Sequence, residues 1–138
     1  RDAQESRGLG DVYKRQQLCG LTEAQLTGCG LGYRTRYIQH AAAQAAARTL
    51  DLDALAVLPD NALFSRLLTL DGVGKKVANC VCLFGYGRTA MAPIDVWIQR
   101  LIDEEFGGRD PFPAYGQQAG IVQQYLFYYK RSISTQKK

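Results

Sequence analysis

The spacing of apolar and polar residues predicts helices along nearly the whole chain. No convincing alternation typical of a strand occurs, and there is no long internal repeat. We therefore predict an all-α helical bundle of about six helices with short connections. We expect a short helix capped by Thr22 and ending at Gly28 and Gly30, followed by a helix over 33–50, which contains the AAAQAAA run, and one over 51–58, which Pro59 stops. The next helix is expected to be capped by Asp60 and to carry Leu63, Phe64, Leu67 and Leu68 on one face. The remaining helices are expected over 75–84, with Val77, Ala78, Val81 and Phe84 on one side, over 96–105, capped by Asp95, and over 114–129.

Composition narrows the class of protein without naming a function. The 138 residues are 46% hydrophobic and 22% charged with a net charge of +4, which fits a single globular domain but does not by itself indicate a nucleic-acid partner. No apolar run approaches the roughly 20 residues that span a membrane. His40 is the single histidine, so HExxH and paired-histidine metal sites are excluded. Without a CxxC pair or a signal peptide, free thiols in a reducing cytosol are expected for Cys19, Cys29, Cys80 and Cys82.

The two ends differ from the middle of the chain. Residues 1–16 lack apolar periodicity and mix charges densely, so we expect a non-native or disordered leader there. Residues 131–138 are polar and basic and are expected to form a flexible tail. The folded domain is therefore predicted over 17–130.

The segment LLTLDGVGKKVANCVCLF is the most informative in the chain. Its glycines, Gly72 and Gly74, allow positive φ and remove side chains, so the turn amides and the start of the next helix can face an anion such as phosphate. Val73 between them can pack back into the helix pair. A tight helix–helix turn without a ligand is the alternative.

Lys76 and Asp95 are the candidate catalytic pair. The helix dipole and the like charge of Lys75 both favour the neutral amine at Lys76, the form that acts as a nucleophile. Asp95 follows a proline-ordered entry, APIDV, at the start of another helix, where a carboxylate could stabilise a positive sugar in a transition state and help activate the amine. The alternatives are a solvated or phosphate-binding lysine and an aspartate that only caps its helix.

The hairpin GVGKK, its lysine and PIDV together resemble the HhH-GPD superfamily of base-excision DNA glycosylases. The segments LGYRTRYI (31–38) and AGIVQQYLF (119–127) are similar to the 8-oxoguanine DNA glycosylase/AP lyases, and the resemblance covers roughly 18–130. It implies a partial, N-terminally truncated HhH-GPD fold. Trp97 stands where the animal enzymes carry histidine, which indicates a bacterial-type member.

The resemblance also implies site residues. It makes Lys76 the nucleophile on the sugar and Asp95 the catalytic carboxylate, and it assigns Cys80, Gln123 and Phe127 to the pocket of the extruded base. DNA contacts fall on Tyr33, Arg34, Gly72, Val73, Gly74 and Lys75, and backbone carbonyls of Leu68, Leu70 and Val73 match a structural cation site. Taken singly, Cys80 and Phe127 could be core residues, Gln123 a surface residue, and Tyr33 and Arg34 the solvent-facing start of a helix.

The expected function is excision of oxidised purine, 8-oxoguanine, from duplex DNA through a lysine Schiff base and β-elimination. The expected partner is damaged duplex DNA, bound by a monomer in the bacterial cytoplasm near the nucleoid, with no membrane. No cofactor is required beyond the possible hairpin cation, and the four-cysteine iron–sulfur loop of other branches is absent from the sequence. The alternatives are a non-catalytic helix-hairpin-helix DNA-binding module and a monofunctional glycosylase for alkylated bases.

Overall fold

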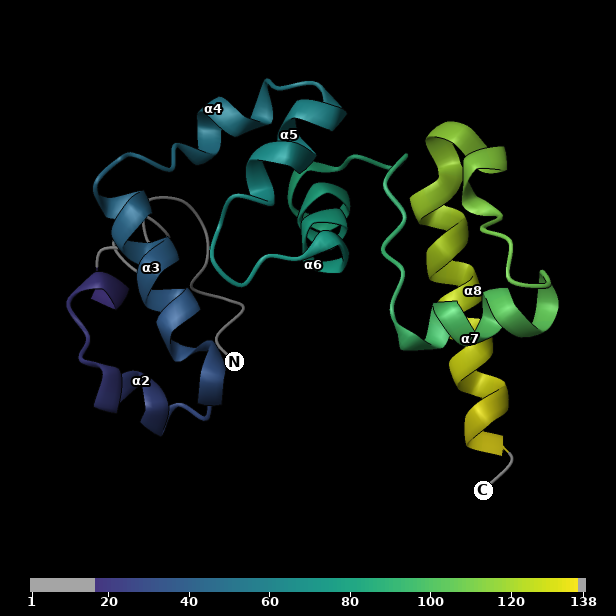
Figure 1. The fold of residues 1–138 in the computed structure, drawn as a ribbon, viewed down its shortest axis with the longest axis horizontal. Coiled ribbons are helices and arrows are strands. Elements are labelled where there is room, and N and C mark those ends of the chain that lie inside the picture. Colours follow the sequence, from purple (N-terminus) through teal and green to yellow (C-terminus); the bar gives the residue numbers. More distant parts are fainter. Residues whose placement is uncertain (1–16, 137–138) are drawn as a thin grey trace, which may run out of the picture. The chain divides into compact units, whose positions relative to one another are not determined.

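The computed structural model describes residues 17–136, and over that range every regular element is a helix (Figure 1). The all-α prediction is therefore confirmed for the part of the chain that the structure describes. The expected leader, 1–16, lies outside the described residues. The described chain divides into two compact units, one formed by 17–57 with 70–72 and the other by 58–69 with 73–136.

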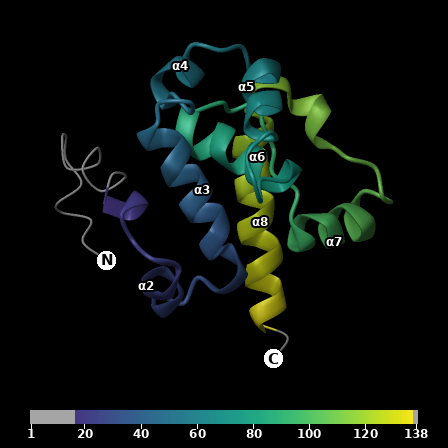
Figure 2. The same ribbon diagram turned by 60° about the vertical axis from the view of Figure 1, so that its left-hand side comes forward.

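In the first unit, α2 lies beside α3, as both ribbon views show (Figures 1 and 2). Thr22 caps α2 as predicted: its hydroxyl accepts from the Gln25 amide, and the Gln25 side chain in turn accepts from the Thr22 amide. The elements of this unit are α2 (Glu23–Gly28), the 3₁₀ turn η1 (Gly32–Arg34), α3 (Thr35–Ala46) and α4 (Leu52–Ala56).

The helix predicted over 33–50 is shorter than expected. It begins with the 3₁₀ turn and ends at Ala46, after which Arg48 adopts a left-handed φ of 56°. The amides of Thr49 and Leu50 both donate to the carbonyl of Gln44, so the chain turns sharply and buries Leu50. Burial of this leucine outweighs the helix propensity of the alanine run.

The second unit contains a core in which α7 packs on α8 and the turn η3 packs on α8 (Figure 1). Buried Ile98, Ile102, Phe112 and Ala119 form its centre, with Leu126 and Phe127 among the side chains packed against it. The elements are α5 (Asp60–Leu67), α6 (Lys75–Cys80), the π-helical turn η2 (Val81–Gly85), α7 (Val96–Glu105), the 3₁₀ turn η3 (Phe112–Gln118) and α8 (Ala119–Gln136).

The last helix also binds α7 through an ion pair. Lys130 is almost completely buried, and its Nζ donates to the carboxylate of Glu104. Helix α8 continues to Gln136, so helical backbone covers 131–136, where the sequence predicted a flexible tail. None of the helices between residues 17 and 136 combines the length and hydropathy needed to cross a membrane.

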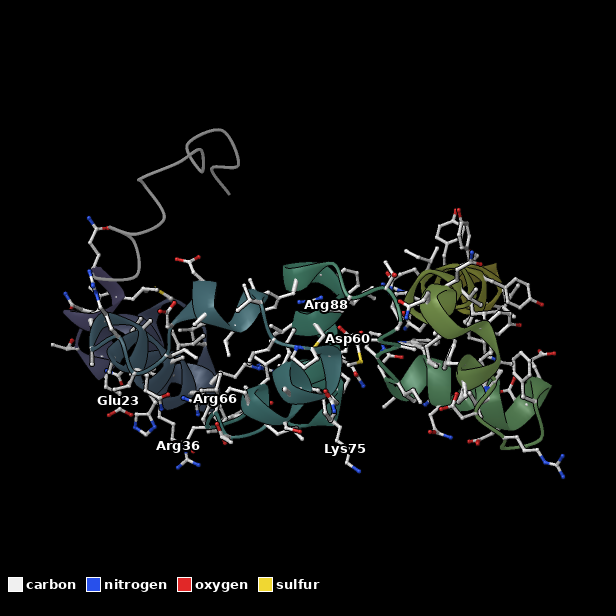
Figure 3. The ribbon with its side chains drawn as sticks, turned by 90° about the horizontal axis from the view of Figure 1, so that it is seen from above. Glu23, Arg36, Asp60, Arg66, Lys75 and Arg88 are labelled. Carbon is white, nitrogen blue, oxygen red and sulfur yellow. The ribbon has the colours of Figure 1, made fainter. Side chains whose placement is uncertain are left out.

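The prediction that Asp60 caps its helix is wrong. Pro59 is the N-cap of α5, and Asp60 is the first helical residue, with no side-chain cap bond at this end. The Asp60 carboxylate instead lies 3.5 Å from Nε of Arg88 (Figure 3). A carboxylate in the first turn still interacts favourably with the helix dipole, so its position is stabilising for a different reason than predicted. Of the predicted apolar face, Leu63 and Leu67 are buried and Leu68 is exposed.

The buried side of 75–84 also differs from the prediction. Ala78 is buried as expected, but Val77 and Phe84 are exposed, and Cys82 and Leu83 are buried in their place. From residue 81 onward the backbone forms the π-helical turn η2, which follows α6 directly and holds more residues per turn than an α-helix. The face presented to the core therefore shifts within 81–85, whereas Val77 precedes this turn and its exposure is not explained by it.

In the structure, the four cysteines are free: Cys19 and Cys29 are exposed, Cys80 is partly buried and Cys82 is buried. Cys82 is fully buried, and burial raises the pKa of its thiol, with a smaller contribution from the charge of Asp60. Because the thiolate is the reactive form, the raised pKa leaves Cys82 unreactive at neutral pH.

We expect a short pulse of iodoacetamide on the native protein to label the exposed Cys19 and Cys29 and to leave Cys82 unlabelled until the chain is denatured. Mass spectrometry of the digested protein measures the labelled sites. Labelling of Cys82 in the native chain as fast as Cys19 would contradict the buried position.

Candidate active site

One cavity of the second unit is lined by all five of the predicted catalytic and base-pocket residues. Its volume is about 160 Å³. Cavities of roughly 150 Å³ accommodate a single aromatic ring such as benzene, so the space suits a ring system more than a whole nucleotide. The lining residues are Lys76, Cys80, Phe84, Pro93, Asp95, Gln123, Gln124 and Phe127.

Helix α6 and the turn after it supply one wall. Lys76, Cys80 and Phe84 are spaced four residues apart and all line the cavity, as expected for one face of a helix. Lys76 lies in the first turn of α6, its side chain is exposed, and Gly74 is the N-cap of that helix. The neighbouring Lys75 extends outward from α6 and does not line the cavity (Figure 3). The structure thus separates two adjacent lysines that composition alone treats alike.

Asp95 supplies a carboxylate from the start of α7. It caps the helix as predicted, and its Oδ1 accepts from the amides of Trp97 at 3.0 Å and Ile98 at 2.9 Å. Both cap bonds go to the same oxygen, so Oδ2 takes no part in the cap. A single carboxylate can therefore hold its helix and line the cavity, and the capping role does not compete with a catalytic one.

Helix α8 supplies another wall of the cavity, with a side-chain amide and an aromatic ring. Gln123 and Phe127 are one turn apart and both line the cavity. Gln123 is only 3% exposed, which rules out the surface position considered from the sequence. Its Oε1 accepts a hydrogen bond from the side chain of Gln124. Phe127 also packs against the core of the unit, so its ring serves both the core and the cavity wall.

Sequence reasoning missed three of the residues that line the cavity and one glycine at the start of α8. Phe84 could have been found from its spacing four residues after Cys80, and Pro93 from its place in APIDV. Gln124 carried no signal, because neighbours on a helix usually point apart. Gly120 was missed as well: its amide donates to the carbonyl of Thr89 at 2.7 Å and connects the start of α8 to the loop that precedes α7.

The glycine turn differs in detail from the prediction. Gly72 has a left-handed φ of 76°, and a Cβ there would lie 2.4 Å from the ring of Tyr37, so both conformation and space require glycine. Gly74 has a φ of −89°, so the expectation of positive φ is wrong for this residue. It begins α6 in an extended conformation that other residues can adopt. Val73 is partly buried.

The predicted DNA-contact residues of the first unit lie on its surface. Tyr33 is 71% exposed, and the guanidinium of Arg34 stacks over its ring at 4.6 Å. The ring of Tyr37 approaches Tyr33 edge-on, with centroids 6.3 Å apart. An exposed aromatic ring with a stacked arginine suits either solvent or a nucleic-acid base, so the assignment of these residues stays a prediction.

The predicted cation site also stays a prediction, since carbonyls of Leu68, Leu70 and Val73 would have to supply it. Among the described residues, no three His, Cys, Asp or Glu side chains gather as metal ligands. That finding concerns side chains and leaves the carbonyl site untested.

The helical architecture, the glycine hairpin and the lysine-lined cavity define a class, the helix-hairpin-helix DNA glycosylase fold. Two solved structures share it. MBOgg1, in complex with a low affinity DNA ligand, superposes with a TM-score of 0.81 at 30% identity, covering 87% of this chain and 45% of that one. The 8-oxoguanine glycosylase/lyase of Clostridium acetobutylicum, in complex with DNA containing cytosine opposite 8-oxoG, gives 0.79 at 28% identity, covering 87% and 44%.

The sequence comparison agrees. A probable N-glycosylase/DNA lyase of Methanothermobacter thermautotrophicus is 35% identical over 115 residues, which are 77% of this chain and 36% of that protein. No family model matches the sequence. Over most of its length, this chain is a homologue of the N-glycosylase/DNA lyases of the 8-oxoguanine glycosylase family. It spans about a third of the length of the curated relative and less than half of the solved structures.

Proposed function

We propose that this chain carries the catalytic centre of a DNA glycosylase with AP lyase activity that excises oxidised purine, 8-oxoguanine, from duplex DNA. The observation that carries the proposal is the cavity itself, which gathers an amine, a carboxylate, a buried amide and an aromatic ring in a space suited to one ring system. A glycosidic bond inside a duplex is inaccessible, so a base extruded into such a cavity is a necessary step.

In this mechanism the neutral amine of Lys76 attacks C1′ of the damaged nucleotide. The glycosidic bond breaks and its electron pair leaves with the base, which takes up a proton. Asp95 stabilises the positive charge that develops on the sugar, since a fixed carboxylate near developing cationic charge is an effective form of catalysis. Cys80 and Phe127 contact the faces of the extruded base, and Gln123 hydrogen-bonds its edge.

The covalent intermediate then becomes a Schiff base between the lysine nitrogen and C1′ as the sugar ring opens. Loss of a proton from C2′ drives β-elimination, in which the bond from C3′ to its phosphate oxygen breaks. Water hydrolyses the Schiff base and regenerates the amine. The hairpin residues Gly72 to Lys75 would hold the DNA backbone, and Tyr33 and Arg34 would fill the gap left by the extruded base.

Borohydride trapping tests the proposal. We expect a covalent protein–DNA complex with duplexes carrying 8-oxoguanine or an abasic site, because borohydride reduces the Schiff base to a stable amine. Undamaged duplex should give none. Salt-sensitive duplex binding without trapping or strand cleavage would identify a non-catalytic binding module instead. Release of free 3-methyladenine without trapping would identify a monofunctional glycosylase.

Gln123→Ala tests the recognition step. We expect the ratio of kcat/KM for 8-oxoguanine over guanine to fall by about tenfold or more, while affinity for undamaged duplex changes little, because the lost group reads a base edge and not the backbone. Single-turnover excision measures the ratio. Gln99→Ala is the matched control, since Gln99 is exposed on α7 and bonds Asp103 outside the cavity. Equal loss for both bases would contradict the assignment.

A further inference from the structure

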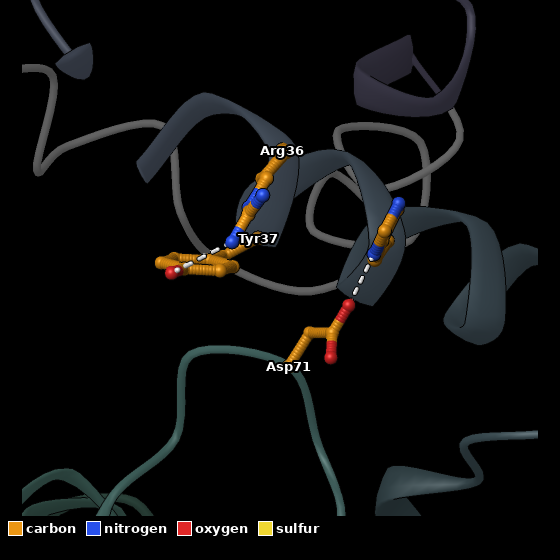
Figure 4. Close-up of polar contacts among 4 residues, drawn as sticks. Arg36, Tyr37 and Asp71 are labelled. Atoms are coloured by element: carbon orange, nitrogen blue, oxygen red, sulfur yellow. Dashed lines mark hydrogen bonds and ion pairs between the residues drawn. The ribbon is translucent and has the colours of Figure 1, made fainter. Parts of the chain in front are cut away.

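The turn that precedes Gly72 carries a negative charge that the proposed function does not explain. Asp71 lies directly before the Gly72-Val73-Gly74 hairpin, where DNA phosphates would approach. A carboxylate beside phosphate is repulsive. In the structure this carboxylate does not stand alone, because His40 of α3 lies against it, with Nδ1 2.6 Å from Oδ2 (Figure 4).

Helix α3 meets the turn through a second contact as well. The ring of Tyr37 lies so close to Gly72 that a side chain there would collide with it. Tyr37 and His40 are spaced three residues apart on α3, so both face the Asp71-Gly72 step from the same side of the helix. In the structure, Tyr37 therefore lies against the backbone of this step, and the hydrogen bond of His40 directs the Asp71 carboxylate toward α3 (Figure 4).

The same face of α3 also carries the cationic side chain of Arg36. Arg36 donates to the Tyr37 hydroxyl at 3.4 Å and stacks over the Tyr37 ring at 5.0 Å. The pKa of Arg36 is raised, mainly by Tyr37 and to a smaller extent by the charge of Asp71. On α3, His40 is therefore in direct contact with Asp71, and the cationic Arg36 lies one turn from His40.

We propose that His40 is a positioning residue for DNA binding: its hydrogen bond holds the Asp71 carboxylate against α3 and so keeps that negative charge from opposing phosphate at the hairpin. This inference rests on the proposed function. It predicts an asymmetry. Removing the His40 side chain should lower the affinity for DNA, and removing the charge of Asp71 should not. Removing both should restore the affinity, because His40 acts on DNA binding only by positioning that charge.

The test is a double-mutant cycle on the full 138-residue chain, with anisotropy of an undamaged fluorescent duplex at low and moderate salt. We expect His40→Ala to weaken binding about threefold to tenfold at low salt and less at moderate salt, as electrostatic screening requires. His40→Gln, which keeps a donor without the ring, should recover part of the loss. Asp71→Asn and the double variant should bind at least as tightly as the original chain.

A merely structural role for the pair predicts a different pattern. Asp71→Asn would then weaken binding as much as His40→Ala, the double variant would recover nothing, and thermal unfolding would show parallel losses; that pattern, or a His40→Ala variant that binds like the original, overturns the inference alone. If the original chain neither binds duplex nor gives a trapped complex, the proposed function fails and the inference falls with it.

Discussion

Lys76→Gln should abolish the covalent complex that borohydride traps and should lower excision of 8-oxoguanine by roughly three orders of magnitude or more, as loss of a covalent nucleophile does in other enzymes. Glutamine is close to lysine in length but its amide nitrogen is not nucleophilic. The substitution therefore removes the chemistry and leaves most of the cavity wall in place. Gel mobility of the trapped complex and single-turnover excision measure the two effects.

Lys75→Gln is the matched control, because it removes the same charge one residue away. Lys75 does not line the cavity, but the proposal places it on the DNA backbone. Its variant should therefore need more DNA for saturation, with a weaker dependence of affinity on salt, yet should trap fully once saturated. Both lysines start the same short helix, so a general loss of folding would affect the two variants alike.

Two results would remove Lys76 from its role. In the first, Lys76→Gln and Lys75→Gln both trap as the original chain does. In the second, Lys76→Gln traps fully but Lys75→Gln does not trap at saturating DNA. The second result would transfer the nucleophile to the neighbouring residue and would be incompatible with the cavity, which Lys75 does not reach.

The capping pattern in the sequence correctly predicted two helix starts at which a side chain caps the backbone. Thr22 and Asp95 cap their helices because their oxygens accept from amides two or three residues ahead, a relation written entirely in the nearby sequence. The cap predicted at Asp60 was wrong by one residue, because Pro59 adopts the extended N-cap conformation and the Asp60 carboxylate pairs with Arg88, 28 positions along the chain. A pattern of neighbouring residues cannot identify a partner so far along the chain.

Periodicity failed where the helix itself changes. The sequence prediction put Val81 and Phe84 on one apolar side with Ala78, but a π-helical turn follows Cys80, and within it Cys82 and Leu83 are buried while Phe84 is exposed. Phe84 is exposed and lies on the cavity side with Lys76 and Cys80, at intervals of four residues. A residue expected to share the apolar side of its helix thus becomes a candidate contact for a ligand.

The cavity could be predicted only in part. Lys76, Cys80, Gln123 and Phe127 were chosen as a set from the family resemblance, and helical spacing alone joins them only in pairs. Bringing the two pairs together depends on where α8 begins, which no spacing rule gives. In the structure, α8 begins next to the loop that precedes α7, and at Gly120 the two are so close that a Cβ would collide with the carbonyl oxygen of Met91.

Gly120→Ala should be the most damaging of the single-methyl additions in the second unit. A Cβ at this position would lie 2.5 Å from the carbonyl oxygen of Met91, 2.7 Å from Cδ1 of Leu83 and 3.0 Å from the carbonyl oxygen of Thr89. Two of these are backbone atoms that cannot turn aside as a side chain can. The free energy of unfolding should fall by about 1–3 kcal/mol, the usual cost of an overpacked core, measured by urea denaturation.

The same substitution reaches the cavity, because the loop from Thr89 leads to Pro93 and Asp95 while α8 carries Gln123. Pushing α8 away from that loop separates the carboxylate wall from the amide wall. Excision should therefore fall even at temperatures where the variant remains folded. Gly85→Ala is the control, since its Cβ would meet only Val81 at an ordinary 3.7 Å, and it should match the original chain in stability and trapping. Equal behaviour of the two alanine variants would show that the approach of α8 to the loop does not shape the site.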